Sequence, residues 1–241
     1  MSNKVSRGWK RNNNLEEEGK MIKNIIFDLD NTIIEDKDDY ILCYKEALRN
    51  CGYDENNYSN IYNALDDYEY YFDETNRFYL KETAIEFINK KLNTNYDIKL
   101  IDEINKVIGK YWTKYILLQE ETVKYLSSKY KLYVFTNWFE SAQEERIKNI
   151  GYLKYFTKIF GADKVGAKPF KTSFDTVLKL ISASPEECIM VGDSKRSDIL
   201  GANNAGISAI LYDYDGNRDK KETCAIDYTV IKDLKELEKI L

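Results

Sequence analysis

The chain has 241 residues, with 41 Asp and Glu against 36 Lys and Arg and a net charge of −5 at pH 7. A chain of this length can bury a large core, as one domain or as one domain with an insertion. The mild acidity argues against binding of a nucleic-acid polymer. The sequence contains no histidine, which excludes Ser-His-Asp catalysis and any metal held by histidine.

Three features of the sequence indicate the compartment. No apolar run reaches the roughly 18 residues needed to span a bilayer, so no membrane contact is expected. The cysteines, at positions 43, 51, 188 and 224, are scattered and form no Cys-x-x-Cys pair, which is typical of reduced thiols. Residues 1–20 are polar, mixed in charge and without an apolar signal segment, and we expect a disordered lead. These features predict a cytoplasmic protein.

An apolar run at residues 22–27 ends at two acids, Asp28 and Asp30. A short β-branched and aromatic run is typical of a strand buried on both faces, and ligands bind at the carboxyl ends of parallel strands. Because alternate residues of an extended chain point to the same side, both acids can face one reacting atom. Two carboxylates held close cannot both ionise freely, so we expect one to keep a raised pKa and act as an acid.

Residues 36–119 show a helical pattern, in which apolar residues recur at steps of three and four, as at Ile101, Ile104 and Ile108. A crossover between two parallel strands needs only about a dozen residues, so this longer segment predicts a separate all-helical cap. The core then comprises residues 21–35 and 120–241.

From residue 120 onward, apolar patterns of strands and helices alternate. Predicted strands lie at 131–135, 158–161, 188–192 and 207–212, and predicted helices at 121–130, 139–150, 172–181, 197–205 and 231–240. Repeated strand-helix units predict an α/β fold with a parallel sheet covered by helices on both faces.

Polar residues that could take part in catalysis or binding lie next to three of these elements. Thr136 and Asn137 end a strand and offer a hydroxyl and backbone amides to a phosphate oxygen. Lys168 lies in a loop before a proline, which disfavours helical geometry there; a solvated surface lysine is the alternative. Asp193 and Asp198 follow the strand at 188–192, although Asp198 alone would also fit an acid in the first turn of a helix.

In this order, the features resemble those of the haloacid dehalogenase-like (HAD) hydrolases, from Met21 to the C-terminus. The resemblance is carried by Asp-Leu-Asp-Asn-Thr at 28–32, by Thr136, by Lys168 and by Gly-Asp-Ser-Lys-Arg-Ser-Asp at 192–198. It implies a Rossmann-like core that uses Mg²⁺. The helical insertion resembles a C1 cap, as in the phosphoglycolate phosphatase-like and nucleotidase-like branches.

The resemblance also implies roles in phosphoryl transfer. Asp28 would attack phosphorus and form an aspartyl-phosphate, and Asp30 would protonate the leaving group and then deprotonate water. Thr136, Asn137 and Lys168 would bind the phosphoryl oxygens. Asp30 is expected to keep its carboxyl free to carry the proton.

A metal site follows from the same resemblance. The Asp28 carboxylate, the Asp30 backbone carbonyl and Asp193 would bind Mg²⁺, which prefers hard oxygen ligands. Asp198 would lie behind them and orient Lys168 or a water on the metal. Charge also requires a cation, because four acids would repel a phosphate dianion at short range.

These roles predict an enzyme that hydrolyses the phosphomonoester of a small metabolite. Family dehalogenases lack the second acid that Asp30 supplies, and Thr32 matches the phosphatase form of the motif better than the mutase form. A phosphomutase on the same core is one alternative. A phosphoacceptor or binding protein without turnover is another, since receiver domains place acids, a threonine and a lysine on a similar sheet. The sequence gives no indication of the oligomeric state.

Substrate identity rests on the predicted cap, which is rich in aromatic residues. We expect most of them to form its core, with stacking on a nucleobase as the alternative. Arg77 and Lys81, one turn apart, could meet a second anionic group of a substrate, but a solvated helical face is favoured. Trp138 and Phe139 are better placed to border the site. A sugar phosphate and a nucleoside monophosphate both remain open. The cap aromatics are Tyr40, Tyr44, Tyr62, Tyr68, Tyr70, Tyr71, Phe72, Phe78, Tyr79, Tyr111 and Trp112.

Overall fold

A computed structural model describes residues 21–35, 39–111, 114–218 and 228–241. Six parallel strands form one sheet in the order β3-β2-β1-β4-β5-β6. The first strand in the sequence therefore lies inside the sheet, between β2 and β4. The strands are β1 (Asn24–Phe27), β2 (Lys131–Thr136), β3 (Phe156–Gly161), β4 (Cys188–Gly192), β5 (Ser208–Tyr212) and β6 (Thr229–Ile231).

Strand β1 shows why the sheet is covered on both faces. All four of its residues are buried. Side chains alternate between the faces, so Ile25 and Phe27 pack into one apolar cluster and Ile26 into a second. In the neighbouring strands, Tyr133 and Met190 pair in register with Ile26 and belong to its cluster.

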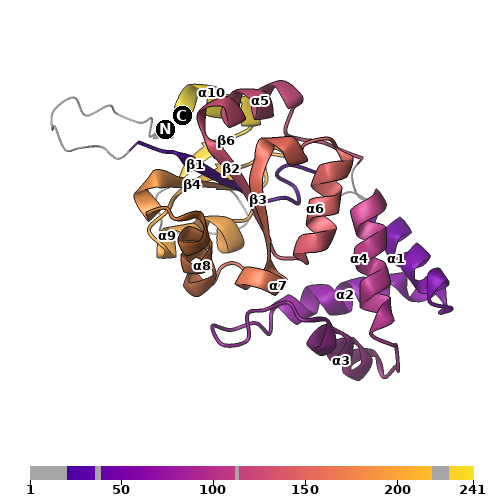
Figure 1. Cartoon of the computed structure of the whole chain (residues 1–241). Helices are drawn as coiled ribbons and strands as arrows, with labels where there is room; N and C mark the ends of the chain where they lie inside the picture. Colours follow the sequence, from indigo (N-terminus) through magenta and orange to yellow (C-terminus); the bar gives the residue numbers. More distant parts are fainter. Residues whose placement is uncertain (1–20, 36–38, 112–113, 219–227) are drawn as a thin grey trace, which may run out of the picture.

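Helices of the core lie on the two faces of the sheet (Figure 1). Residues of α5, α6 and α10 join the cluster of Phe27, whereas residues of α8 and α9 join the cluster of Ile26. The helices are α5 (Glu120–Lys129), α6 (Glu140–Asn149), α7 (Ala162–Val165), α8 (Lys171–Ile181), α9 (Gly201–Asn204) and α10 (Leu237–Ile240). Short 3₁₀ turns, η2 (Leu153–Tyr155) and η3 (Pro185–Glu187), precede β3 and β4.

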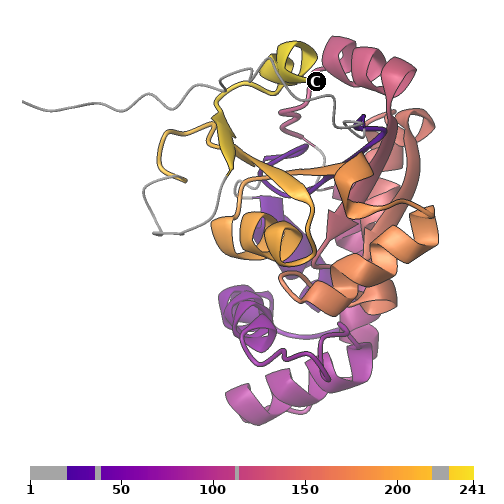
Figure 2. The same ribbon diagram turned by 90° about the vertical axis from the view of Figure 1, so that its left-hand side faces the viewer.

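Four further helices form the helical cap, a group apart from the sheet, on the side where the strands end (Figures 1 and 2). They lie between β1 and α5 in the sequence and are α1 (Asp39–Asn50), α2 (Tyr58–Glu69), α3 (Lys81–Leu92) and α4 (Lys99–Tyr111), with the 3₁₀ turn η1 (Glu55–Asn57) before α2. Within the described residues, no helix is long and apolar enough to cross a membrane.

The two connections between core and cap lie side by side. Ile34 and Ile116 form an antiparallel bridge. Beside it, the Glu35 N–H donates to the Tyr115 carbonyl at 2.7 Å, and the Leu117 N–H donates to the Ile33 carbonyl at 2.8 Å. The chain therefore leaves the core and returns to it at adjacent points.

The expected α/β fold, with a Rossmann-like parallel sheet and a helical cap, is confirmed. The predicted helix at 231–240 is wrong at its start, because Thr229–Ile231 is the edge strand β6. Asp233 then caps a 3₁₀ turn, η5 (Leu234–Glu236), and forms a capping box with Glu236, so the helix starts only after it. The predicted lead (1–20), Trp112 and Cys224 lie outside the described residues, and the domain boundaries at 35–36 and 119–120 stay predictions.

Candidate active site

The carboxyl ends of β1, β2 and β4 meet where the strand order reverses, which is the usual ligand position in an open parallel sheet. A cavity of about 380 Å³ lies there, lined by residues of both core and cap. All seven predicted site residues line it: Asp28, Asp30, Thr136, Asn137, Lys168, Asp193 and Asp198. A larger hollow, of about 470 Å³, adjoins the amino ends of β1, β2 and β4, where Lys23 and Glu187 are paired with each other.

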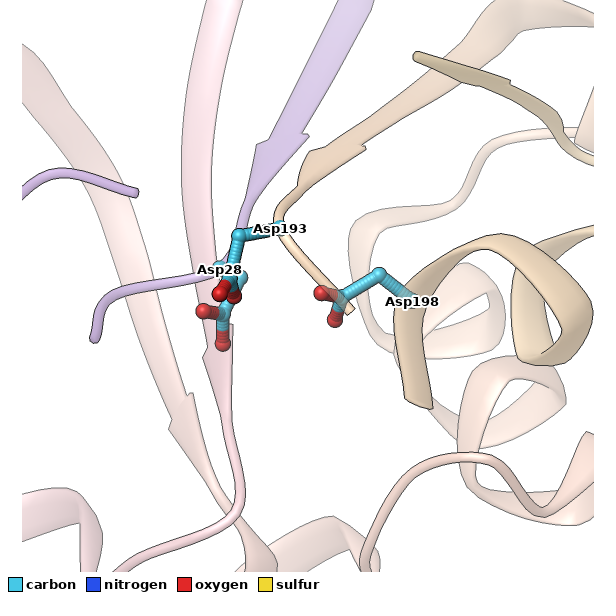
Figure 3. A group of neighbouring side chains, drawn as sticks. All are labelled: Asp28, Asp193 and Asp198. Carbon is cyan, nitrogen blue, oxygen red and sulfur yellow. The ribbon is translucent and has the colours of Figure 1, made fainter. Parts of the chain in front are cut away.

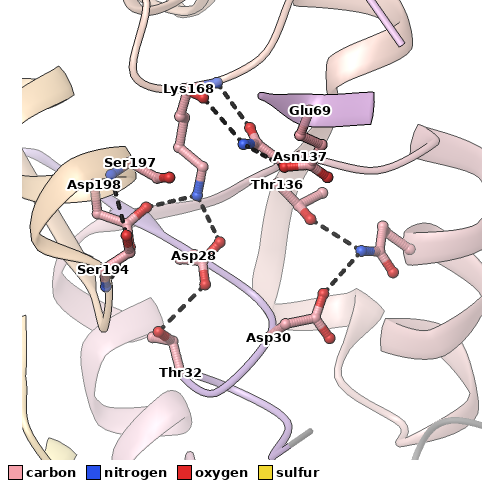
Figure 4. A network of polar contacts seen from close by, with 11 residues as sticks. Asp28, Asp30, Thr32, Glu69, Thr136, Asn137, Lys168, Ser194, Ser197 and Asp198 are labelled. Atoms are coloured by element: carbon pink, nitrogen blue, oxygen red, sulfur yellow. Dashed lines mark hydrogen bonds and ion pairs between the residues drawn. The ribbon is translucent and has the colours of Figure 1, made fainter. Parts of the chain in front are cut away.

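Lys168 lies at the centre of the polar network (Figure 4). Its Nζ donates to Asp28 Oδ1 and to Asp198 Oδ1, each at 2.6 Å. Burial alone would lower the pKa of Lys168, but the two carboxylates outweigh it and hold the pKa above its usual value. Lys168 is therefore a buried, charged residue within the site and not a solvated surface lysine.

Asp28, Asp193 and Asp198 form a buried acid cluster (Figure 3), with one oxygen of each within 4.8 Å of the others. Burial raises the pKa of Asp28 well above its usual value, and the charges of Asp198 and Asp193 add to the effect. Burial and Asp198 also raise the pKa of Asp193 to about 7, although Arg218 Nη1 lies 2.8 Å from its Oδ2. The three carboxyls contact two cations, Lys168 and Arg218, so that one negative charge is left over when all three are ionised. Oxygen ligands with this unmet charge fit a divalent cation.

The turn after β4 brings Asp198 close to the strand end. A Cβ at Gly192 would lie 2.2 Å from Asp198 Oδ2, so only glycine leaves room for this carboxylate. The same oxygen accepts the Ser194 N–H at 3.0 Å, and the Ser194 side chain accepts the Ser197 N–H at 3.1 Å. These bonds begin a π-helical turn, η4 (Lys195–Leu200), which continues into α9. Such turns are frequent at functional sites.

Asp30 differs from the expectation that its carboxyl stays free. Arg146 Nη2 lies 2.7 Å from its Oδ1, and Gln143 Nε2 donates to its Oδ2 at 3.3 Å. Arg146 Nη1 also donates to Gln143 Oε1 at 2.8 Å, which fixes the two α6 side chains against each other. Asn31, next in the chain, has a φ of 61°, a conformation that asparagine adopts more readily than most residues. The pKa of Asp28 is raised, but its first cause is burial, and the acids that add to the shift are Asp198 and Asp193 and not Asp30 as expected.

Thr136 and Asn137 occupy different parts of the network. The Thr136 hydroxyl accepts from Gln143 Nε2 at 2.9 Å, so Gln143 links it to Asp30. The Asn137 side chain instead accepts the Lys168 N–H at 2.7 Å and donates to the Lys168 carbonyl at 3.0 Å. The Asn137 side-chain amide therefore fixes the backbone of the loop that carries Lys168. Its expected contact with phosphate stays a prediction.

The cap contributes a wall that sequence reasoning did not assign. Tyr44, Tyr62, Asp66 and Glu69 line the cavity from α1 and α2. Several cap aromatics are core residues as expected, with Tyr44, Tyr68 and Tyr79 buried, but Tyr70 and Tyr71 are 64% and 69% exposed. Of the two aromatics after Asn137, Trp138 lines the cavity and Phe139 is buried against Tyr79.

The polar residues that were missed at the site include Asp66, Glu69, Gln143, Arg146 and Arg218. Gln143 and Arg146 are three positions apart, so they share a helix face, and this spacing was the only signal for them. No local pattern singles out Glu69 or Arg218. Glu69 Oε2 lies 3.4 Å from Asn137 Nδ2, and this contact joins α2 of the cap to the loop after β2.

Glu69→Gln is expected to raise the melting temperature at pH 8 to 9 and to leave it almost unchanged near pH 4. Burial raises the pKa of Glu69 to about 8 from its usual 4.5. The folded protein therefore loses stability as the pH rises from about 4.5 through 8, because a charge must then be buried. A glutamine has no such charge. Thermal melts of both proteins across this range measure the difference.

Asp67→Asn is the matched control, since Asp67 lies on the same helix and pairs with Lys91 at the cap surface. An exposed ion pair contributes at most about 1 kcal/mol to the free energy of unfolding. Asp67→Asn should therefore lower the melting temperature slightly or not at all, and it should not raise it at high pH. If the melting temperatures of wild type and Glu69→Gln changed in parallel with pH, the Glu69 carboxyl would not have a raised pKa in the folded protein.

Comparison with known proteins agrees with this architecture. The chain is 37% identical to the glyceraldehyde 3-phosphate phosphatase of Methanothermobacter thermautotrophicus over 48% of its length and 53% of that protein. It is 36% identical to the pyrimidine 5'-nucleotidase YjjG of Escherichia coli over 46% of this chain and 49% of that protein. The matches thus span about half the length of these relatives.

A solved structure and a family profile extend the comparison to most of the chain. The HAD-hydrolase YfnB from Bacillus subtilis, solved with bound magnesium, superposes with a TM-score of 0.68 at 22% identity, covering 92% of this chain and 99% of that one. This likeness shows the fold. The profile described as haloacid dehalogenase-like hydrolase matches residues 25–212. The chain therefore belongs to the haloacid dehalogenase-like hydrolases.

Proposed function

We propose that this protein hydrolyses phosphomonoesters of small metabolites. The observation that carries the proposal is the meeting of a nucleophile, Asp28, a second acid, Asp30, and a buried cation, Lys168, in one cavity of about 380 Å³. This volume suits a small molecule rather than a polymer. Two relatives whose names give a substrate, a triose phosphate phosphatase and a nucleotidase, support the same class of reaction.

The first chemical step joins Asp28 to the phosphoryl group. A carboxylate oxygen of Asp28 attacks phosphorus, the bond to the leaving oxygen breaks, and Asp30 gives that oxygen a proton. Lys168 and the Thr136 hydroxyl would hold the phosphoryl oxygens. Gln143 contacts both Thr136 and Asp30, so it would orient the hydroxyl that binds phosphate and the acid that supplies the proton.

The second step frees the enzyme. Asp30 takes a proton from a water molecule, the water oxygen bonds to phosphorus, and the bond to Asp28 breaks with release of inorganic phosphate. Arg146 and Gln143 keep the Asp30 carboxylate in one position for both proton transfers. The active site thus returns to its starting protonation state.

Asp28, Asp193 and the Asp30 backbone carbonyl would hold Mg²⁺. A bound Mg²⁺ would neutralise the acid cluster and clamp the phosphate charge. Asp198 uses one oxygen for Lys168 and the other for the Ser194 N–H, which supports a role in orienting Lys168.

Incubation with p-nitrophenyl phosphate and Mg²⁺ tests the proposal. Steady release of p-nitrophenol with an equal amount of inorganic phosphate is expected. A single burst that leaves a stable acyl-phosphate would indicate a phosphoacceptor instead. Transfer of phosphate to a second hydroxyl without free phosphate would indicate a phosphomutase.

Removal of divalent metal with a chelator is expected to stop turnover, and Arg218→Gln is expected to lower the Mg²⁺ concentration that gives half-maximal activity. The Arg218 guanidinium lies 2.8 Å from Asp193 Oδ2 and competes with a metal for this oxygen. Titration of activity with Mg²⁺ measures the shift, with Arg49→Gln as control because Arg49 pairs with Glu55 on the cap surface. A higher Mg²⁺ requirement in Arg218→Gln would contradict the competition.

A further inference from the structure

The part of the cavity wall that the cap supplies is itself acidic. Asp66 and Glu69, from the last two turns of α2, line it together with Tyr44 and Tyr62. Glu69 contacts the amide of Asn137, whose neighbour in the chain is the phosphate-binding candidate Thr136. A substrate whose phosphate binds beside Thr136 therefore shares the cavity with these two carboxyls.

The positive side chains that line the cavity are already engaged. Lys168 contacts Asp28 and Asp198, and Arg146 contacts Asp30 and Gln143. Among the described residues, no other Lys or Arg lines the cavity.

The two cap cations considered from the sequence lie elsewhere. Lys81 pairs with Asp102, and both side chains are substantially exposed. Arg77 donates to the Glu74 carbonyl at 2.6 Å and packs against Gly166. Neither lines the cavity, so neither meets a second anionic group of a substrate there.

The carboxyls of this wall favour a particular kind of substrate group. Carboxyl oxygens accept hydrogen bonds, and a hydroxyl group can donate to them. An ionised carboxylate or phosphate only accepts, so a hydroxyl group matches the lining by Asp66 and Glu69 better.

We propose that Asp66 and Glu69 select substrates whose leaving group is neutral and bears hydroxyls, and reject those with a second anionic group. This inference rests on the proposed phosphatase function. It favours sugar phosphates and nucleoside monophosphates over esters such as 2-phosphoglycolate. Hydrogen bonds to the two carboxyls favour the right group, and negative charge disfavours the wrong one. Asp66 supplies this charge, and Glu69, whose pKa is raised to about 8, adds to it as the pH rises through that value.

The test compares two substrates that differ by one oxygen and one negative charge, glyceraldehyde 3-phosphate and 3-phosphoglycerate. A second pair, glucose 6-phosphate and 6-phosphogluconate, repeats the comparison on a longer chain. At pH 9, where Glu69 is ionised, we expect kcat/KM for the substrate with the neutral leaving group to exceed that for its partner at least about 30-fold in each pair, which corresponds to about 2 kcal/mol. Equal values within both pairs would overturn the inference.

Variants assign the selection to the two acids. In Asp66→Asn/Glu69→Gln the ratio within each pair is expected to fall at least about tenfold, because the repulsion is gone. Asp67→Asn is the matched control, since it removes a neighbouring acid of α2 that pairs with Lys91 outside the cavity. An unchanged ratio in the double variant would show that other residues set it. Circular dichroism confirms that each variant is folded, and the wild-type ratios test the inference without any variant.

The assay also separates the two proposals. If the wild type hydrolyses neither p-nitrophenyl phosphate nor any of the four metabolites with Mg²⁺, the phosphatase function fails. If it hydrolyses p-nitrophenyl phosphate but shows no preference within the pairs, the phosphatase function holds and only the selection by Asp66 and Glu69 is wrong.

Discussion

Asp28→Asn is expected to lower kcat for p-nitrophenyl phosphate by at least about 10³-fold, the scale seen when an enzyme loses its nucleophile. An amide cannot form the acyl-phosphate, yet it keeps the size of the side chain and a carbonyl oxygen for the Lys168 ammonium, now 2.6 Å from Oδ1. Steady-state kinetics measure the loss. Acid quenching followed by mass spectrometry should find a phosphorylated Asp28 peptide in wild type and none in the variant.

Asp163→Asn is the matched control for this substitution. Asp163 is also a largely buried acid just past a strand end, but it lies after β3, accepts the Glu140 N–H at 2.8 Å and does not line the cavity. Its replacement should leave kcat within a few-fold of wild type. Retained turnover in Asp28→Asn would show that another group attacks phosphorus.

Asp30→Asn is expected to lower kcat by roughly 10² to 10⁴-fold, the range for loss of general acid–base catalysis. The loss should be larger for an alkyl ester such as glycerol 3-phosphate than for p-nitrophenyl phosphate, because p-nitrophenolate leaves without needing a proton. With the aryl ester, the acyl-phosphate should accumulate, since the base for the second step is missing. Rapid-quench measurements of phosphorylated enzyme detect this burst.

Structure gives this prediction a specific control. Gln143 and Arg146 still face residue 30 in the variant, and the asparagine oxygen can accept from either, so its position should be kept. Gln143→Leu, by contrast, keeps the acid but removes its link to Thr136. Equal losses on alkyl and aryl esters in Asp30→Asn would indicate a positioning role for Asp30 instead of proton transfer.

The sequence was sufficient for the parts of the site that local pattern determines. A buried strand followed by acids, and the same arrangement at Asp193, predicted a parallel sheet with acids at its carboxyl edge. The positions of the acids after buried strands depend on short-range periodicity, and for that reason they could be predicted. The acids meet because β1 and β4 are neighbours in the sheet, an order that short-range periodicity does not determine.

The residues that contact the predicted site only because distant elements pack together could not be predicted. Arg146 reaches Asp30 from the buried face of α6, and nothing in the sequence distinguishes that face from a solvated one. Glu69 comes from a helix whose placement depends on how the cap packs on the core. Strand β6 was missed because three residues at a sheet edge are too few for an alternating pattern to be recognised.

The pairing of Ile34 with Ile116 has a consequence for how such proteins diversify. Because the core holds both ends of the inserted helices together, a different insertion of any length can begin and end at the same two points without changing the register of β1 and β2. Under the proposed function, Asp66 and Glu69, which would recognise the leaving group, lie between these two points in the sequence, and the residues that would cleave the phosphate bond lie outside them. A lineage can exchange one group of residues while keeping the other intact.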